Sequence, residues 1–420
     1  MGSCQARDPG ELERATMTVP ADERVRAERN YFPPGKSGVQ RYHFPNGVEE
    51  VRFGADVTRD VAALCDQYGY QRPFVFSSRT LNRTTDVVDG IAESLGTKLV
   101  GRSDRVGEHA PVSNVIAAIS EVREANADVL VCIGGGSVMD FGKFVQLGVT
   151  EGVRTRDDFR ALRVDQEPKL DQRPELRQIT IPTTFSLPEW TPAGTPVDDE
   201  TGKKITLRIP DGVGRAILYD PNVVRHTPVR LALVTAIRGL DHSINTVCST
   251  APVDLCTVLA LQAITHFHTA IPLLANGDAD IALPMLQRAS WLGGVCQMSV
   301  PHGFSHFMVH VLAPWANIGH SETACVMMLA QARWWREHND PRLAEVAAAM
   351  GRPEETLDVI LYDLLRGIGL PTSLREIGID PATIHEVVPL ALAHPYVTLH
   401  NMRPILTADD ILAILASVAD

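Results

Sequence analysis

Hydrophobic positions in the first half of the chain alternate between short continuous runs and longer periodic ones. The continuous runs, rich in β-branched and aromatic residues, are PFVFSS (73–78), ADVLVCIGGG (127–136) and RQITIPTT (177–184). Between them, apolar residues recur with helical spacing, as in 57–69 and 112–126. Strands that are apolar on both faces and separated by amphipathic helices are typical of a parallel sheet covered on both sides. We therefore predict an α/β fold for this half.

Further strand patterns complete this half of the chain. VEEVRFG (48–54), KLVG (98–101) and AILYD (216–220) have strand character. TPVDDETGKKITL (195–207) places an Asp-Asp-Glu-Thr-Gly turn between two β-type runs, which predicts a hairpin.

The pattern changes after Pro221, where one helical period follows another and no convincing strand interrupts them. A length of 420 residues suits two or three domains. We predict a flexible arm at 1–30, a dinucleotide-binding α/β domain with a parallel Rossmann-like sheet at 31–220, and an all-helical domain at 221–420.

Composition narrows the possible partners and the compartment. The net charge of -12 argues against binding to nucleic-acid phosphates. The seven cysteines include no C-x-x-C pair, so we expect free thiols in a reducing compartment. The polar N-terminus has no signal-peptide core, and we find no apolar run that approaches the ~18 residues of a membrane span. These features favour a cytoplasmic protein without nucleic-acid or membrane partners.

The first candidate for chemistry is the glycine-rich turn GGGSVMD (134–140). It lies at the carboxyl end of a predicted strand and opens a helix, where backbone N–H groups and the helix N-terminus attract an anion. It is neither G-x-G-x-x-G nor a Walker loop. By itself the turn is either an anion site or a turn without a ligand.

Histidines of the helical half are the second candidate, namely His242, His302, His306, His310 and His320. His306 and His310 are four residues apart and share one helix face, with His302 expected one turn earlier on the same face. Imidazoles on an apolar helix are costly to bury unless they bind something. A histidine that is merely satisfied in the core remains the alternative, above all for His302.

Four segments together resemble the iron-containing alcohol dehydrogenase family. GGGSVMDFGK (134–143) is similar to its GGGS-x-x-D-x-A-K signature, and IPTTFSLPEWTP (181–192) to its second cofactor segment. LYDPNVV (218–224) and RGIGLPTSLREIGI (366–379) match the family's domain junction and a C-terminal stretch. The second segment is closest to the maleylacetate-reductase-like branch. The resemblance implies the two-domain architecture that this family shares with dehydroquinate synthase.

This resemblance also implies NAD(P)H as the cofactor. The residues that would contact it are Ser78, Gly135, Gly136, Ser137, Asp140, Thr183, Thr184 and Lys204. The glycines and Ser137 would hold the pyrophosphate, the threonines the nicotinamide half, and Lys204 the ribose. Ser78 stands where NAD-preferring members place an aspartate, and Arg79 follows it, so NADPH is accepted in principle as well as NADH.

The family's metal site uses an aspartate, a histidine four residues later, and two histidines fourteen residues apart. His242, His306 and His320 match the histidines, but the aspartate position, 238, is Arg. A divalent cation about 4 Å from Arg238 would meet repulsion of about 8 kcal/mol at an effective dielectric of 20. We therefore expect that the metal is absent; if retained, it is Fe or Zn at the three histidines. The maleylacetate-reductase branch also departs from the aspartate and works without metal.

Two roles are open for Arg238. It can form an ion pair with Asp241, one helical turn along, or its planar fork can bind an anionic substrate. The resemblance implies a small oxo-acid such as maleylacetate. His242, His306, His310 and His320 would then polarise the acceptor and relay a proton, with His310 nearest the nicotinamide.

The leading hypothesis is a metal-independent NAD(P)H-dependent reductase of a small anionic substrate, acting as a homodimer. The alternatives are a metal-dependent alcohol dehydrogenase with altered ligands, a sugar cyclase of the dehydroquinate-synthase type, and a binding protein without catalysis. The last is suggested by Phe185, Leu187, Pro188 and Trp190, which stand where small residues are common. The exact substrate, and the choice between C=O and C=C reduction, stay open.

Overall fold

The structure is a computed structural model. It describes residues 42, 47–107, 110–163, 174–209, 211–300, 302–338, 342–394 and 406–420. The arm predicted at 1–30 lies outside the described residues.

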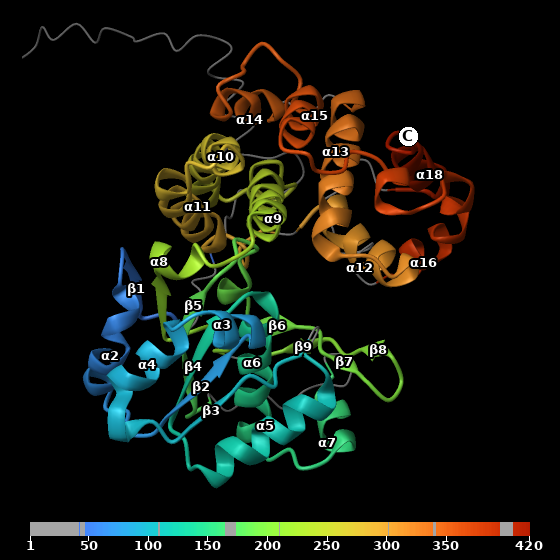
Figure 1. Cartoon of the computed structure of the whole chain (residues 1–420). Coiled ribbons are helices and arrows are strands. Elements are labelled where there is room, and N and C mark those ends of the chain that lie inside the picture. The colour runs from blue at the N-terminus through green and yellow to red at the C-terminus, as the bar shows by residue number, and fades with distance from the viewer. Residues whose placement is uncertain are drawn as a thin grey trace, which may run out of the picture. The chain divides into compact units, whose positions relative to one another are not determined.

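A six-stranded parallel sheet forms the centre of the first half (Figure 1). Its strands, in spatial order, are β1 (Glu50–Phe53), β10 (Ala216–Tyr219), β5 (Arg177–Pro182), β4 (Val129–Gly134), β2 (Pro73–Ser77) and β3 (Gly101–Ser103). Every residue of β2 and β4 is buried, as their continuous apolar runs predicted. Strand β3 begins at the end of the segment expected for it, because residues 96–98 form a 3-10 turn instead.

Helices cover both faces of the sheet, and alternate strand residues pack against opposite layers. Phe76 and Cys132 belong to the core beneath α5 and α6, whereas Val75 and Val131 belong to the core beneath α2 and α4. The helices and 3-10 turns of this half are η1 (Val57–Asp60), α2 (Val61–Tyr68), α3 (Arg79–Thr84), α4 (Val87–Leu95), η2 (Gly96–Lys98), α5 (Val112–Glu124), α6 (Gly136–Thr150), α7 (Arg156–Arg160) and η3 (Pro188–Trp190).

The predicted hairpin is present as short antiparallel strands. β7 (Val197–Asp198) pairs with β8 (Lys203–Lys204), and β6 (Ala193–Gly194) pairs with β9 (Leu207–Arg208).

Among the described residues, only helices and turns follow β10, as the sequence predicted. They are α8 (Pro221–Val224), α9 (Val229–Val247), α10 (Asp254–Ala275), α11 (Ala279–Gly294), α12 (Phe304–Ala316), α13 (His320–Glu337), α14 (Leu343–Ala349), α15 (Leu357–Gly367), η4 (Arg375–Ile377), η5 (Pro381–Glu386), α16 (Val388–Ala393) and α18 (Ala408–Ala416). One apolar core joins them. The fold is therefore an α/β domain followed by an all-helical one.

Helix α10 is more apolar than we expected from the sequence, in which we found no run approaching the length of a membrane span. By length and composition it could cross a membrane, with a mean hydropathy of 1.4 over 18 residues. Its buried residues, including Phe267 and Ile271, belong to the helical core, and α10 packs against α9 and α11. A core helix of a soluble protein meets the same criterion.

The cysteines that the structure describes are all free and buried, which agrees with the expectation of free thiols. They are Cys65, Cys132, Cys248, Cys256, Cys296 and Cys325.

Candidate active site

The glycine-rich turn joins the carboxyl end of β4 to the N-terminus of α6. Gly134 has a positive φ of 155°, and a Cβ there would lie 2.5 Å from a methyl of Val138. A Cβ on Gly135 would lie 3.0 Å from Cγ2 of Thr184. Only glycine suits this turn, whose backbone is thereby open to close approach by a ligand.

Thr183 and Thr184, which directly follow the neighbouring strand β5, border the turn. The Thr183 N–H donates to the Gly134 carbonyl at 2.9 Å, and the Thr183 carbonyl accepts from the Thr227 hydroxyl at 2.7 Å. The buried Thr184 hydroxyl has no hydrogen-bond partner among the described residues. An orphaned polar group beside a glycine turn is what a polar ligand would satisfy, so these residues fit a dinucleotide phosphate.

Ser78 lies at the carboxyl end of β2, next to the same turn, and its N–H donates to the Ile133 carbonyl at 3.3 Å. Its hydroxyl caps α3 by accepting from the Leu81 N–H at 3.2 Å.

The carboxylate of Asp104, near Ser78, was not predicted from the sequence. Asp104, directly after β3, accepts from the Asn82 amide of α3 at 3.3 Å. Because β3 pairs in parallel with β2, the residue after β3 lies at the same edge of the sheet as Ser78, and this pairing could have pointed to Asp104.

The first turns of α6 carry the other predicted cofactor residues. Ser137 is half-buried beside Gly136. Asp140 accepts from the buried Lys143 ammonium at 2.7 Å, and the same ammonium donates to the Pro188 carbonyl at 2.8 Å. Asp140 therefore helps to hold the segment after Thr184 against α6.

Glu189, the glutamate of this segment, is fully buried. Its Oε1 accepts from the Tyr219 hydroxyl at 2.7 Å, and that hydroxyl accepts from the Trp190 indole N–H at 2.7 Å. Its Oε2 has no partner among the described residues. Burial raises the pKa of Glu189 to about 7, although the Tyr219 hydrogen bond acts in the opposite direction. The indole ring of Trp190 packs on Gly294, where a Cβ would approach it to 2.1 Å.

The histidines of the helical half form a continuous row. Ring centroids lie 5.1 Å apart for His242 and His306, 5.1 Å for His306 and His310, and 5.7 Å for His310 and His320. His302 is not on the helix as expected, since α12 begins at Phe304; its ring nevertheless stacks on His306 at 4.2 Å.

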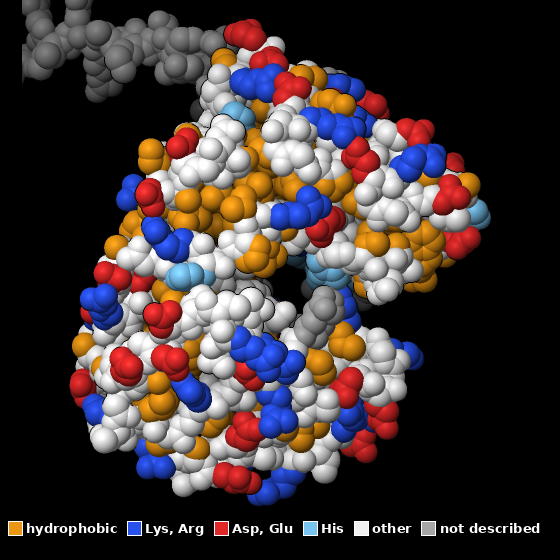
Figure 2. Space-filling view, viewed as in Figure 1, with side chains coloured by type: hydrophobic (Ala, Val, Ile, Leu, Met, Phe, Trp, Pro, Cys, Tyr) orange, Lys and Arg blue, Asp and Glu red, His pale blue; other side chains and the backbone are white. Residues whose placement is uncertain are grey.

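The histidine row extends beyond the residues predicted from the sequence. His394, which caps the C-terminus of α16, has its ring 6.4 Å from that of His310. No sequence spacing relates the two, so only the packing of α16 near α12 could reveal it. Figure 2 shows histidine side chains in pale blue beside a hollow near the middle of the visible face.

Burial dominates the electrostatics of the row. It lowers the pKa of His242, His306 and His310 well below the usual histidine value, and lowers that of His302 to about 4. The nearby Arg238 charge acts in the same direction. The rings are therefore neutral near pH 7.

Arg238 projects from α9 into this row. Its Nη1 donates to Asp241 Oδ2 at 3.0 Å, and its Nη2 lies 2.7 Å from Nδ1 of His306. The ion pair that the sequence offered as one of two roles for Arg238 is thus present. Asp241 also accepts from the hydroxyl of Ser305 at 2.5 Å and the amide of Asn245 at 2.9 Å.

Lys204 contacts the other end of the row. From β8 its Nζ reaches to 3.0 Å from Nε2 of His320, the first residue of α13. Burial lowers the pKa of Lys204. The structure therefore brings this predicted ribose ligand to the histidines, so the hairpin of the α/β half contacts the histidine row. A separate pocket of about 480 Å³ beside the start of α13 is lined by Arg230, Gly319, Glu322 and Arg366 among others, and by none of the predicted site residues.

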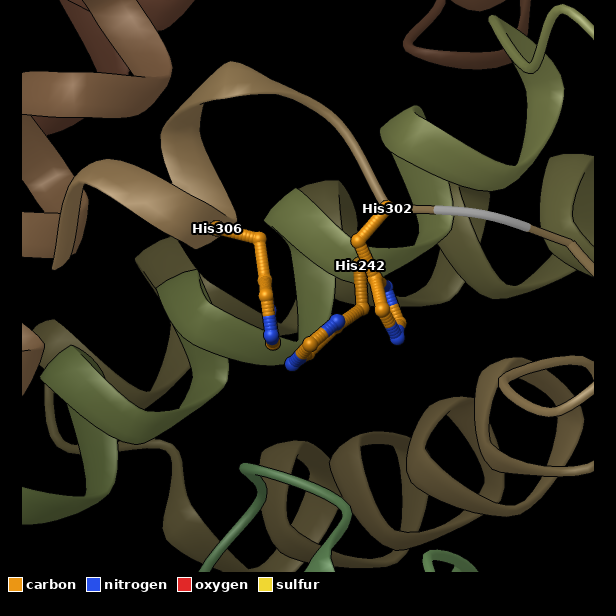
Figure 3. A group of neighbouring side chains, drawn as sticks. All are labelled: His242, His302 and His306. Carbon is orange, nitrogen blue, oxygen red and sulfur yellow. The ribbon is translucent and has the colours of Figure 1, made fainter. Parts of the chain in front are cut away.

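A metal ion is the group that the family's name implies, and the donors here can be tested against it. Ring nitrogens of His242, His302 and His306 lie within 4.8 Å of one another, and the three rings point into the same space (Figure 3). One of these donors is, however, already bonded to Arg238, and Asp241 faces Arg238 and Ser305. The family's carboxylate donor therefore has no counterpart among the described residues, and the ligand set of the family's metal site is not reproduced.

Comparison with known proteins agrees with the fold. Residues 49–221 match "Iron-containing alcohol dehydrogenase", and residues 232–419 match "Fe-containing alcohol dehydrogenase family, C-terminal". Maleylacetate reductase 1 of Rhodococcus opacus is 25% identical over 355 residues, which cover 84% of this chain and 90% of that protein.

Two solved structures share the fold. Maleylacetate reductase from Agrobacterium tumefaciens superposes with a TM-score of 0.76 at 23% identity, covering 91% of this chain and 99% of that one. Sulfoacetaldehyde reductase from Bifidobacterium kashiwanohense, in complex with NAD+, superposes with a TM-score of 0.81 at 19% identity and the same coverage.

Fold and site together define an oxidoreductase of the alcohol dehydrogenase type. The chain belongs to the iron-containing alcohol dehydrogenase family, and within it to the maleylacetate-reductase-like branch.

Proposed function

We propose that this protein is a metal-independent, NAD(P)H-dependent reductase of a small anionic oxo-acid of the maleylacetate type. The observation that carries the proposal is the Arg238 guanidinium inside the histidine cluster, 2.7 Å from His306 Nδ1. It stands where the family's carboxylate ligand would be. The maleylacetate reductases among the relatives support the substrate class.

Asp241 weakens the repulsion that Arg238 would exert on a metal ion. Its carboxylate partly neutralises Arg238, so a metal would meet less repulsion than an isolated arginine would cause. The stronger obstacle to a metal is the hydrogen bond that engages a ring nitrogen of His306. Arg238 and Lys204 contact the row with two positive groups, whereas Asp241 bonds Arg238 with one negative group, and this surplus of positive charge favours an anionic substrate.

Each group has a role in the proposed reaction. When bound, NAD(P)H supplies the hydride. The glycine turn and Thr184 hold the dinucleotide at the carboxyl edge of the sheet. His242 and His306 hydrogen-bond the oxygen of the acceptor, and His310, between His306 and His320, relays a proton. We expect the protein to act in the cytoplasm as a homodimer, without nucleic-acid or membrane partners.

Two measurements test the proposal. Purified protein should contain no stoichiometric divalent metal, and EDTA should leave NADPH oxidation by maleylacetate unchanged. One equivalent of iron or zinc in the native protein, absent from a His242→Gln variant, would contradict metal independence.

The second measurement concerns the cofactor. NADPH should be accepted at least comparably with NADH. A preference for NADH near a hundredfold, about 2.7 kcal/mol, would show that the cofactor site rejects the 2′-phosphate. In that case Asp104 is the carboxylate whose negative charge we would expect to repel it.

A metal-dependent alcohol dehydrogenase is the second candidate. It is favoured by the three converging histidines, His242, His302 and His306. Metal analysis decides between the two, because this candidate requires a bound ion for turnover.

A further inference from the structure

We infer that Arg238 takes the place of the family's metal as the positive group at the histidine cluster, and that it fixes His306 in the tautomer with the hydrogen on Nε2. In this tautomer His306 offers the acceptor oxygen an N–H donor and no lone pair. The statement about the acceptor rests on the proposed function, whereas the tautomer is a property of the resting protein.

The contact between Arg238 and His306 determines which ring nitrogen carries the hydrogen. Nη2 lies 2.7 Å from Nδ1. A guanidinium has five N–H donors and no acceptor, so Nδ1 must be the acceptor. A neutral imidazole whose Nδ1 accepts carries its hydrogen on Nε2. An imidazolium has no ring lone pair with which to accept a hydrogen bond, so the same contact requires a neutral ring.

A buried network holds the guanidinium in this position. Nη1 of Arg238 donates to Asp241 Oδ2 at 3.0 Å, and Oδ1 of that carboxylate accepts from Ser305 and Asn245. Three donors on one carboxylate are what its ionised form requires. The network joins α9 to the first turn of α12, where Ser305 precedes His306, so it orients both the guanidinium and the imidazole.

The same hydrogen bond takes His306 out of the set of metal ligands. A histidine binds a metal through a ring lone pair. Here the lone pair of Nδ1 accepts from Arg238 and Nε2 carries a hydrogen, so His242 and His302 are the converging histidines that retain this capacity. A positive group bonded to Nδ1 also polarises the ring and strengthens its Nε2–H as a donor. Arg238 is thus a positioning residue that both excludes the metal and supplies charge to His306.

Nitrogen-15 NMR of protein labelled at histidine tests the tautomer directly. Proton–nitrogen correlations distinguish the two neutral forms, and His306→Gln identifies the His306 signals by their loss. We expect a protonated Nε2 and an unprotonated Nδ1 in the native protein. Arg230→Ala is the matched control, because Arg230 lies on the same helix with a 61% exposed side chain and should leave these signals unchanged. A hydrogen on Nδ1 of His306 in the native protein would overturn the inference.

A second variant guards against failure to fold, since removing Arg238 alone leaves the Asp241 charge buried. Arg238→Met combined with Asp241→Asn removes both charges and keeps similar volumes. In this variant we expect His306 to populate both tautomers and the protein to bind about one equivalent of Co²⁺ in an absorption titration, where the native protein binds none. A folded double variant with the native tautomer and no Co²⁺ binding would overturn the inference.

These outcomes separate the inference from the proposed function. Native protein with the expected tautomer but no NAD(P)H-dependent turnover of oxo-acids would end the proposed function alone. Metal-independent turnover with the hydrogen on Nδ1 would end the inference alone.

Discussion

Arg238 and Asp241 form an ion pair whose side chains are 11% and 0% exposed, and buried pairs differ in energy from surface pairs. Desolvation offsets much of their attraction, but loss of one partner leaves an uncompensated charge in the core. Burial accordingly raises the pKa of Asp241 and lowers that of Arg238.

We predict that Arg238→Ala lowers the free energy of unfolding by about 3–5 kcal/mol. The paired variant Arg238→Met with Asp241→Asn should lose much less, because no charge is left alone. Arg225→Ala, which breaks an exposed pair with Asp280, is the control and should change stability by less than about 1 kcal/mol. Urea unfolding of the three variants is the measurement. Equal losses in the free energy of unfolding for Arg238→Ala and Arg225→Ala would show that the buried pair contributes no more to stability than the exposed one.

Glu189 predicts a pH dependence of stability. Its folded pKa of about 7 lies above the ordinary 4.5, so the folded state retains a proton that the unfolded state releases. The stabilising effect is complete below about pH 4.5, and it is lost as the pH rises through 7. The full difference is about 3 kcal/mol.

The matched variant is Glu189→Gln, which is neutral at every pH. We expect it to be more stable than the native protein at pH 8 and to show a smaller fall in stability between pH 5.5 and 8. Urea unfolding at both values checks this. Identical pH profiles for the two proteins would refute the raised pKa.

At the scale of elements, the β4–α6 turn is the most sharply constrained segment. Gly135→Ala would place a Cβ 3.0 Å from Thr184 Cγ2, which is tighter than ordinary contact, and it would narrow the turn. We predict that NADPH binds about tenfold more weakly or worse, a loss of at least ~1.4 kcal/mol. Fluorescence titration with NADPH measures the effect.

Gly90→Ala provides the control for that substitution. Gly90 is inside α4 with no atom within 4 Å of an added Cβ, so alanine should leave NADPH binding unchanged and stabilise the helix by ~0.5–1 kcal/mol. If Gly135→Ala binds NADPH as the native protein does, the turn does not hold the pyrophosphate.

At the scale of the whole molecule, the histidine row receives a residue from the α/β half. Lys204 of β8 reaches His320 of α13, 116 positions later in the chain. If the histidine row binds the substrate as proposed, Lys204 makes substrate binding depend on the position of β7 and β8.

We predict that Lys204→Ala raises the KM for the anionic substrate roughly ten- to a hundredfold, the effect of losing one charge-assisted contact. The melting temperature should change little, because the Lys204 ammonium forms no other side-chain hydrogen bond among the described residues. Lys203→Ala, an exposed neighbour on the same strand, is the control and should keep native kinetics. An unchanged KM in Lys204→Ala would remove the lysine from the substrate pocket.

Local patterns in the sequence were sufficient to predict much of the secondary structure of this protein. Continuous apolar runs predicted β2 and β4, because strands buried on both faces favour apolar residues along their whole length. Strand β5 was predicted from a similar run, although it also buries the polar residues Gln178 and Thr180. The glycine turn, the β7–β8 hairpin and the helical second half likewise follow from local spacing and turn chemistry. Position 238 was already unusual in sequence, since an arginine stands where the family places a carboxylate.

Tertiary structure alone decided how these parts combine. Arg238 meets His306 across 68 positions, Lys204 meets His320, and His394 joins the row from α16. His302 lies before α12 and not on it, because the helix begins only after Gly303. Such contacts depend on how α9, α12 and the hairpin pack against one another, and helical or strand periodicity describes only the face that each element buries, not the partner it meets.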